Sequence, residues 1–148
     1  MKLTRYTDYA LRVLLHLAAH QDRLCSIAEI SRAYGISESH VMKVVHDLGK
    51  GGFVATSRGR GGGLRLGRPA EEIGVGQVVR YAEDGFDLVD CKSCVIAPLC
   101  RLSGVLGEAM AAFLAVLDRH SLADLVSGPG GDGLRRLFLV PPVPSAAG

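Results

Sequence analysis

The chain has 148 residues, 48% of them apolar, with 17 Lys and Arg against 15 Asp and Glu. This composition can bury a core, which excludes wholesale disorder, and the length suits one compact domain with an appendage. No apolar stretch approaches the roughly 20 residues that span a bilayer, and the N-terminus does not resemble a signal peptide. We therefore expect a cytoplasmic protein whose four cysteines are thiols or metal ligands rather than disulfides.

The charge is unevenly divided along the chain. Residues 1–70 carry 11 Lys and Arg against 5 Asp and Glu, whereas residues 71–148 carry 6 against 10. The first half is therefore basic and the second half acidic. A basic half predicts a module that binds a polyanion.

The first elements predict a helix-turn-helix. Apolar residues at helical spacing indicate a helix over residues 8–19. Ser26 opens a capping box, which predicts a second helix that ends at Gly35. Ser37 caps a third helix that ends at Gly51 and has an apolar stripe: Val41, Val44, Val45 and Leu48. Two short helices joined by a tight turn are typical of this motif.

A hairpin is expected to follow. The β-prone runs 53–56 and 64–66 flank a connection over residues 57–63 that is rich in glycine and arginine. A helix-turn-helix followed directly by a basic hairpin is a winged helix. Beyond it we expect a helix over residues 75–83, an irregular segment over 85–99 and a long helix over 100–120.

The long helix is interpreted as a dimerisation element. Its apolar residues lie close to heptad spacing: Leu102, Leu106, Met110, Phe113 and Leu117. The alternative is that this stripe packs on its own domain. The expected fold is mainly α: a winged helix-turn-helix domain (1–84), a cluster-binding loop (85–100), a dimerisation helix with a short turn capped by Ser121 (101–126) and a flexible tail (127–148), ordered only over residues 134–140.

Two sets of side chains are candidate DNA ligands. The exposed N-terminal face of the second helix of the motif carries short polar and basic residues that can reach base edges: Ser37, Ser39, His40 and Lys43. The hairpin offers arginines suited to phosphates or a minor groove: Arg58, Arg60, Arg65 and Arg68. The alternative is that these arginines only keep a hairpin soluble.

Cysteines provide the other candidate site. Cys91, Cys94 and Cys100 are spaced C-x2-C-x5-C, and soft thiolates select zinc or an iron–sulfur cluster. Three cysteines leave both open, because each centre normally takes a fourth ligand. Cys100, at the start of the long helix, gains from the helix dipole. Cys25 is interpreted as a small buried apolar residue rather than a ligand.

Several segments together carry a family resemblance. They are residues 3–12 (LTRYTDYALR), His40 with Lys43, residues 58–69 (RGRGGGLRLGRP), the cysteine triplet and residues 122–125 (LADL). Over about residues 1–126 the chain resembles the winged-helix regulators that include the nitric-oxide-sensing iron–sulfur repressors of the NsrR type and the iron–sulfur biogenesis regulator IscR.

The resemblance implies a cofactor and its ligands. In that family three cysteines ligate an iron–sulfur cluster, [4Fe–4S] or [2Fe–2S], near the dimer interface, and the cluster state controls operator binding. IscR-like members use a histidine where this chain has Ser103. NsrR-like members can use an aspartate from the first helix of the other subunit, a position that Asp8 matches. Taken alone, Asp8 is also an ordinary acidic residue at a helix N-terminus.

Two departures from the family pattern concern its two functional regions. The gap between Cys91 and Cys94 is shorter than family members usually show, which leaves the cluster type open. Glu38 and Ser39 replace an Arg-Asn pair common in NsrR-like recognition helices, so a different operator sequence is expected.

The resulting hypothesis is a cytoplasmic homodimeric repressor, not an enzyme. It binds an inverted-repeat operator in double-stranded DNA, and nitric oxide releases it through the cluster. One alternative is the same fold sensing iron or cluster supply, and another is a zinc-stabilised interaction module. A redox enzyme is disfavoured, because the sequence offers no nucleotide-binding loop and no partnered acid–base set.

Overall fold

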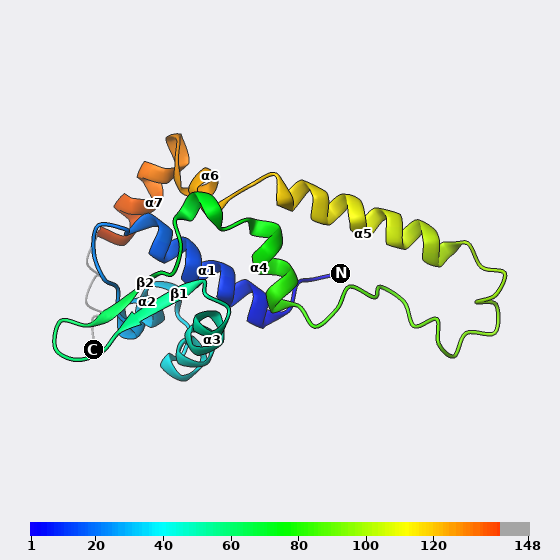
Figure 1. The fold of residues 1–148 in the computed structure, drawn as a ribbon, viewed down its shortest axis with the longest axis horizontal. Helices are drawn as coiled ribbons and strands as arrows, with labels where there is room; N and C mark the ends of the chain where they lie inside the picture. Colours follow the sequence, from blue (N-terminus) through cyan, green and yellow to red (C-terminus); the bar gives the residue numbers. More distant parts are fainter. Residues whose placement is uncertain (140–148) are drawn as a thin grey trace, which may run out of the picture.

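The computed structural model describes residues 1–139, with side chains as far as Leu137. The elements in chain order are α1 (Arg5–Ala19), α2 (Ile27–Tyr34), α3 (Glu38–Lys50), β1 (Val54–Ser57), β2 (Gly63–Leu66), the 3-10 helix η1 (Ala70–Glu72), α4 (Val75–Ala82), α5 (Leu102–Asp118), α6 (Leu122–Val126) and α7 (Pro129–Leu139). Figure 1 shows α5 extending away from the other elements, with the irregular segment at its far end. The predicted mainly α winged-helix fold is confirmed.

The two helices of the helix-turn-helix begin at the predicted caps. The Ser26 hydroxyl accepts a hydrogen bond from the Glu29 backbone N–H at 3.1 Å, and the Glu29 carboxylate accepts one from the Ser26 N–H, also at 3.1 Å. Gly35 ends α2 with φ of 64°, a left-handed conformation that glycine adopts without strain. Ser37 accepts from the His40 N–H at 3.3 Å and opens α3. Local hydrogen bonds therefore define the turn between the two helices.

The core is formed around α1. Its fully buried side chains come from most elements of the fold: Val13, Leu14, Ile30, Val41, Leu48, Ile73, Val78 and Leu122. α1 begins at Arg5 rather than at the predicted residue 8, because the Thr4 hydroxyl accepts from the Thr7 N–H at 3.2 Å and serves as N-cap. Glu83, after α4, accepts a hydrogen bond from the Thr4 N–H at 2.7 Å and ties this end of α1 to α4.

The wing is joined to the segment that leads into α2. Strands β1 and β2 pair antiparallel, and Cys25 extends the sheet by a bridge to Leu64. The Cys25 N–H donates to the Leu64 carbonyl at 2.9 Å, and the Leu64 N–H donates back at 2.7 Å. At Gly62 a Cβ atom would lie 2.2 Å from the Ser57 carbonyl oxygen, so the wing turn closes only with glycine at that position. β2 is thus hydrogen-bonded on both sides, to β1 and to Cys25.

α5 has two different faces. Four residues of the predicted stripe are half-buried against their own chain: Leu106, Met110, Phe113 and Leu117. By contrast, Leu102, Val105 and Val116 are 55, 59 and 45% exposed, and none of the 17 residues of α5 is fully buried. The stripe therefore packs partly on its own domain, as the alternative interpretation expects, and a second apolar face remains free.

The C-terminal region differs from the prediction. The sequence predicts a flexible tail from residue 127, whereas α7 covers Pro129–Leu139. A Cβ atom at Gly131 would lie 1.8 Å from the Val126 carbonyl oxygen, so glycine permits the close contact between α6 and α7. Leu134 packs against the core from α7. The rest of the predicted tail, residues 140–148, lies outside the described residues.

Among residues 1–139, none of the helices is both long and apolar enough to cross a membrane.

Two leucines of α6 provide a test of this packing. Leu122 is fully buried, whereas Leu125 is 40% exposed. We expect Leu122→Ala to lower the free energy of unfolding by about 2–5 kcal/mol, because it leaves a cavity in the core. Leu125→Ala should change it by about 0.5 kcal/mol or less. Urea unfolding of both variants at one protein concentration measures the difference, and equal losses would contradict the placement of α6.

Candidate DNA-binding surface and metal centre

The exposed side of α3 carries the predicted recognition residues. Ser37, at the N-cap, and three residues of the first turns are all exposed: Ser39, His40 and Lys43. The opposite side of α3 buries the predicted stripe of Val41, Val44, Val45 and Leu48. The His40 ring centroid lies 6.1 Å from that of Tyr9 in α1. The structure therefore brings these candidates together on one accessible surface.

Two further residues extend this surface and were missed in the sequence analysis. Met42 is 52% exposed, and His46 is exposed one turn later. Met42 follows Ser39 by three residues and His46 follows Lys43 by three, so both lie on the same face of the helix as these candidates. That spacing is the signal that could have found them.

The arginines of the wing differ in their exposure to solvent. Arg58 and Arg60 are exposed in the turn between the strands, where Gly59 and Gly61 have φ of 90° and 75°. Arg65 is exposed on β2. Arg68 is half-buried, with its guanidinium 4.8 Å from the centroid of the Phe53 ring. Three wing arginines are thus free to meet a ligand, whereas Arg68 packs at the base of the wing.

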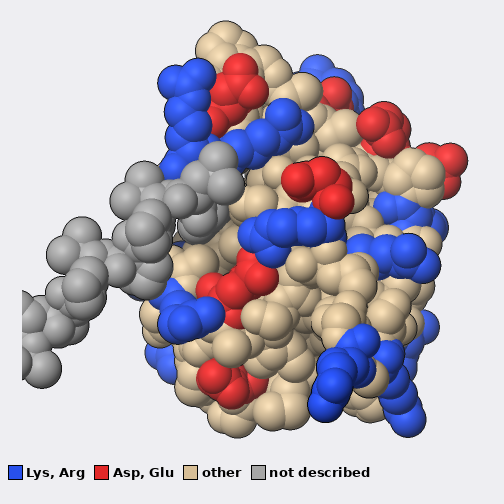
Figure 2. Space-filling model, turned by 90° about the vertical axis from the view of Figure 1, so that its left-hand side faces the viewer, with Lys and Arg blue, Asp and Glu red and all other residues tan. Residues whose placement is uncertain are grey.

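Figure 2 views the end of the molecule at which the tip of the wing lies in Figure 1. Lys and Arg side chains are spread over this face, with Asp and Glu side chains between them. The cations of this face are therefore separated by acidic side chains and do not form one dense basic patch.

The cysteine loop is a series of turns. Cys94 N–H donates to the Cys91 carbonyl at 3.4 Å, Ala97 N–H to the Cys94 carbonyl at 3.2 Å, and Cys100 N–H to the Ala97 carbonyl at 3.4 Å. All three thiols are free; Cys91 and Cys100 are half-buried and Cys94 is exposed. Cys91 also lines a cavity of about 580 Å³ together with Phe86 and residues of α5.

By their chemistry the donors of this loop suit an iron–sulfur cluster, although among the described residues the structure brings three or more ligand atoms within 4.8 Å of one another only at His16, His20 and Cys25. Three free thiols on successive turns can supply thiolate ligands, which soft iron–sulfur centres prefer. Apolar side chains beside them are strongly exposed, with Val95 at 93% and Leu99 at 91%. Apolar surroundings of this kind exclude water from a cluster once a second surface covers them.

Asp8 is not near the cysteines of its own chain. It lies in the first turn of α1, where its carboxylate accepts a hydrogen bond from Arg12 Nε at 2.9 Å and is 47% exposed. Figure 1 shows the cysteine loop at the far end of α5, well separated from α1. A shared centre between Asp8 and these cysteines therefore requires two chains.

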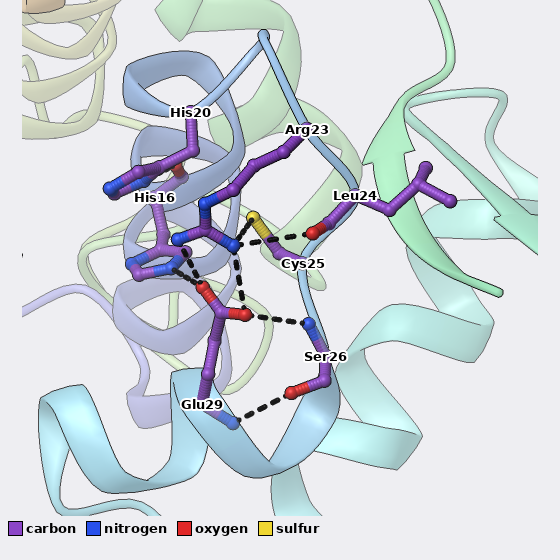
Figure 3. Close-up of polar contacts among 7 residues, drawn as sticks. All are labelled: His16, His20, Arg23, Leu24, Cys25, Ser26 and Glu29. Carbon is purple, nitrogen blue, oxygen red and sulfur yellow. Dashed lines mark hydrogen bonds and ion pairs between the residues drawn. The ribbon is translucent and has the colours of Figure 1, made fainter. Parts of the chain in front are cut away.

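A buried polar cluster was not predicted from the sequence. His16 of α1 and His20, the C-cap of that helix, lie beside Cys25, and the ligand atoms of the three residues lie within 4.8 Å of one another. Figure 3 shows Glu29 and Arg23 beside them. Arg23 donates to both Glu29 carboxylate oxygens, at 3.0 and 2.7 Å. The two histidines stand four residues apart on one helix face, a spacing visible in the sequence, but the position of Cys25 depends on its bridge to the wing.

The protonation states in this cluster follow from burial. Burial lowers the pKa of His16 below its ordinary value despite the hydrogen bond to Glu29, so a neutral imidazole is favoured. Burial by itself raises the pKa of Glu29, but hydrogen bonds from Arg23, His16 and Ser26 outweigh it and lower the pKa to about 2. Burial raises the pKa of Cys25 to about 12, so the isolated thiol stays protonated and unreactive at neutral pH.

The fold and these surfaces define a winged-helix DNA-binding protein with a separate thiol-bearing loop. Residues 3–128 match the family Rrf2, described as an iron-dependent transcriptional regulator. The chain belongs to this family.

Similar proteins support the same assignment. The HTH-type transcriptional regulator NsrR of Bacillus subtilis is 53% identical over 132 residues, covering 85% of this chain and 90% of that protein. The regulator of the same name from Halalkalibacterium halodurans is 44% identical over 148 residues, covering 96% and 100%. Among solved structures, T. potens IscR is 27% identical with a TM-score of 0.72, covering 85% of this chain and 86% of that chain. Oxidized Staphylococcus aureus CymR is 26% identical with a TM-score of 0.71, covering 84% and 95%.

The comparisons confirm the resemblance described from the sequence. The chain is a helix-turn-helix transcriptional regulator of the NsrR-like group within Rrf2. The roles of individual site residues remain predictions.

Proposed function

We propose that this chain is a cytoplasmic, homodimeric repressor that binds an inverted-repeat operator and senses nitric oxide through an iron–sulfur cluster. The observation that carries the proposal is the cysteine loop: three free thiols among exposed apolar side chains, displaced from the DNA-binding domain by α5. The relatives named NsrR support the nitric oxide signal.

The cluster ligands proposed are Cys91, Cys94, Cys100 and Asp8 of the partner subunit. The separation of Asp8 from the loop within one chain supports a ligand from a second chain. When bound, the cluster supplies iron that reacts with nitric oxide. A carboxylate is a harder and weaker ligand for this iron than a thiolate, so Asp8 would be the ligand that is lost most easily.

The DNA contacts proposed divide between α3 and the wing. Ser37, Ser39, His40 and Lys43 would face the major groove, because α3 exposes them on one side. Arg58, Arg60 and Arg65 would neutralise phosphates or enter a minor groove. One such unit reads few base pairs, so two units in a dimer would supply the specificity, and the free apolar face of α5 is suited to that contact.

Iron or cluster supply is a second candidate signal. The family description as iron-dependent and the likeness to IscR favour it. Treating the holo-protein with nitric oxide and, separately, with an iron chelator distinguishes the two candidate signals. The signal is indicated by the agent that releases the protein from the operator at few equivalents per cluster. A zinc-stabilised module would instead be colourless and would contain no sulfide.

The assignment of Arg60 to a phosphate predicts a salt effect. Arg60→Gln should weaken binding to all DNA sequences alike and reduce the log–log salt slope by about 0.9, the value for one phosphate contact. Arg136→Gln, which changes an exposed arginine of α7, is the matched control and should leave the slope unchanged.

Substitutions on α3 are expected to change sequence preference rather than the salt dependence of binding. Ser39→Ala or His40→Ala should alter which operator is preferred, with little change of slope. Fluorescence anisotropy titrations at several salt concentrations measure both effects. An Arg60 variant that changes only sequence preference would contradict the assignment.

A further inference from the structure

A second set of metal-binding groups lies inside the winged-helix domain, apart from the cysteine loop. His16, His20 and Cys25 are 2, 4 and 1% exposed, and their ligand atoms lie within 4.8 Å of one another. We propose that they form a site for a thiophilic ion such as Zn²⁺, with two imidazole nitrogens and one thiolate as ligands.

Both imidazoles have the second contact that orients metal-bound histidines. Such a histidine usually donates its other ring N–H to a carboxylate or a backbone carbonyl. His16 Nε2 lies 3.0 Å from a Glu29 carboxylate oxygen, and His20 Nδ1 lies 2.8 Å from the His16 carbonyl oxygen. Because these oxygens accept, the protons sit on those two nitrogens. With those protons in place, each ring carries its lone pair on the other nitrogen, which is Nδ1 in His16 and Nε2 in His20.

The dimensions of the set suit a tetrahedral ion. Zinc binds nitrogen at about 2.0–2.1 Å and sulfur at about 2.3 Å, which places its ligand atoms about 3.3–3.6 Å apart. The ligand atoms lie within 4.8 Å of one another, so an ion would draw the three side chains closer together. Binding releases the Cys25 thiol proton to solvent, and water takes the fourth position.

Two oppositely charged side chains, Arg23 and Glu29, lie beside the site. The guanidinium of Arg23 lies 3.6 Å from the Cys25 sulfur, and by itself it would oppose a cation. Glu29 accepts two hydrogen bonds from that guanidinium and also faces His16 (Figure 3). The carboxylate therefore compensates the arginine and orients one ligand.

The position of the site connects it to the DNA-binding elements. His16 belongs to α1 and His20 is its C-cap, Cys25 pairs with Leu64 of the wing, and Glu29 completes the capping box of α2. An ion bound here would join α1, the wing and the helix-turn-helix at one point. Because the unfolded chain lacks the site, the ion should raise thermal stability by mass action.

The test uses the full chain with the loop cysteines replaced, C91S/C94S/C100S, so that the proposed cluster site cannot contribute. We expect this protein to bind one equivalent of Zn²⁺ in competition with a chromophoric chelator and to unfold at a higher temperature with the ion. Co²⁺ should give a thiolate-to-metal charge-transfer band. Adding Cys25→Ser or His20→Gln should weaken Zn²⁺ at least tenfold and remove the stabilisation, whereas His46→Gln, on the exposed side of α3, should change neither.

Circular dichroism establishes that each variant is folded. If Cys25→Ser and His20→Gln do not fold, Glu29→Gln replaces them; loss of the group that orients a ligand typically costs about 10–100-fold in metal affinity. Absence of Zn²⁺ binding in the C91S/C94S/C100S protein, or unchanged affinity in the folded site variants, would overturn the proposal. Neither result bears on the cysteine loop, so the proposed repressor function would stand independently.

Discussion

Anaerobically purified protein is expected to contain iron and acid-labile sulfide, and Cys94→Ala is expected to lose both. Cys94 is the exposed member of three free thiols in one loop, and it stands between the two half-buried ones. Removing it leaves two thiolates and one carboxylate, too few strong ligands to hold an iron–sulfur centre. Cys91→Ala and Cys100→Ala should behave in the same way. Absorption spectra with iron and sulfide counts measure the loss.

Cys25→Ala is the matched control for this prediction. Cys25 is 1% exposed in the core and lies on the segment paired with β2, so its loss should leave iron and sulfide unchanged. Zinc without sulfide in the wild-type protein, lost on replacing Cys94, would contradict the cluster. Zinc lost only on replacing Cys25 would point instead to the buried histidine site.

Asp8→Ala is expected to retain most of its iron and yet to bind the operator at least tenfold more weakly, a difference of about 1.4 kcal/mol. Three thiolates remain to hold the cluster, but the proposed connection between α1 of one subunit and the loop of the other is lost. Half-sites in a symmetric operator lie about one DNA turn apart, so two recognition helices must keep that spacing. A ligand that joins the subunits can favour one arrangement over others, and its loss removes that preference.

The measurement is an anaerobic gel-shift titration of both proteins, with and without a few equivalents of nitric oxide per cluster. The wild-type protein should lose the operator on treatment, whereas Asp8→Ala should bind poorly before it. Asp132→Ala, at an exposed position of α7, is the control and should behave as wild type. If Asp8→Ala keeps both its affinity and its nitric oxide response, the ligand from the partner subunit is wrong, while the cysteine ligands are unaffected.

The helix-turn-helix was predictable because its boundaries depend on local hydrogen bonds. Ser26 and Ser37 each accept from a backbone N–H three residues later, as Ser121 does at the start of α6, and Gly35 adopts the left-handed conformation expected after a helix. Signals of this kind act within one turn of chain and can be recognised without knowing the fold. The start of α1 was predicted three residues late because Thr4 was not recognised as its cap.

Elements that depend on contacts between distant residues were not predictable in this way. α7 has glycine at three positions, a composition typical of loops. It is nevertheless helical, and the absence of a side chain at Gly131 allows it to pack closely against α6. Likewise, the sequence shows His16 and His20 on one helix face but gives no position for Cys25. The predicted cluster ligands cannot be placed together from one chain either, because the cysteine loop lies at the far end of α5, well separated from α1, which carries Asp8.

Because α5 extends away from the other elements, a small rotation at one of its ends produces a large displacement at the other. The helix is joined to α4 near its C-terminal end, where Arg80 pairs with Asp118 at 2.8 Å, and it carries the cysteine loop at its other end. Seventeen residues span about 25 Å at 1.5 Å per residue, so a tilt of about 10° at the joint displaces the loop by about 4 Å. That displacement exceeds the length of a metal–ligand bond, about 2.3 Å for a thiolate. A metal–ligand bond formed by the cysteine loop would therefore fix the angle between α5 and α4 to within a few degrees. When that bond breaks, the angle is again free to fluctuate thermally.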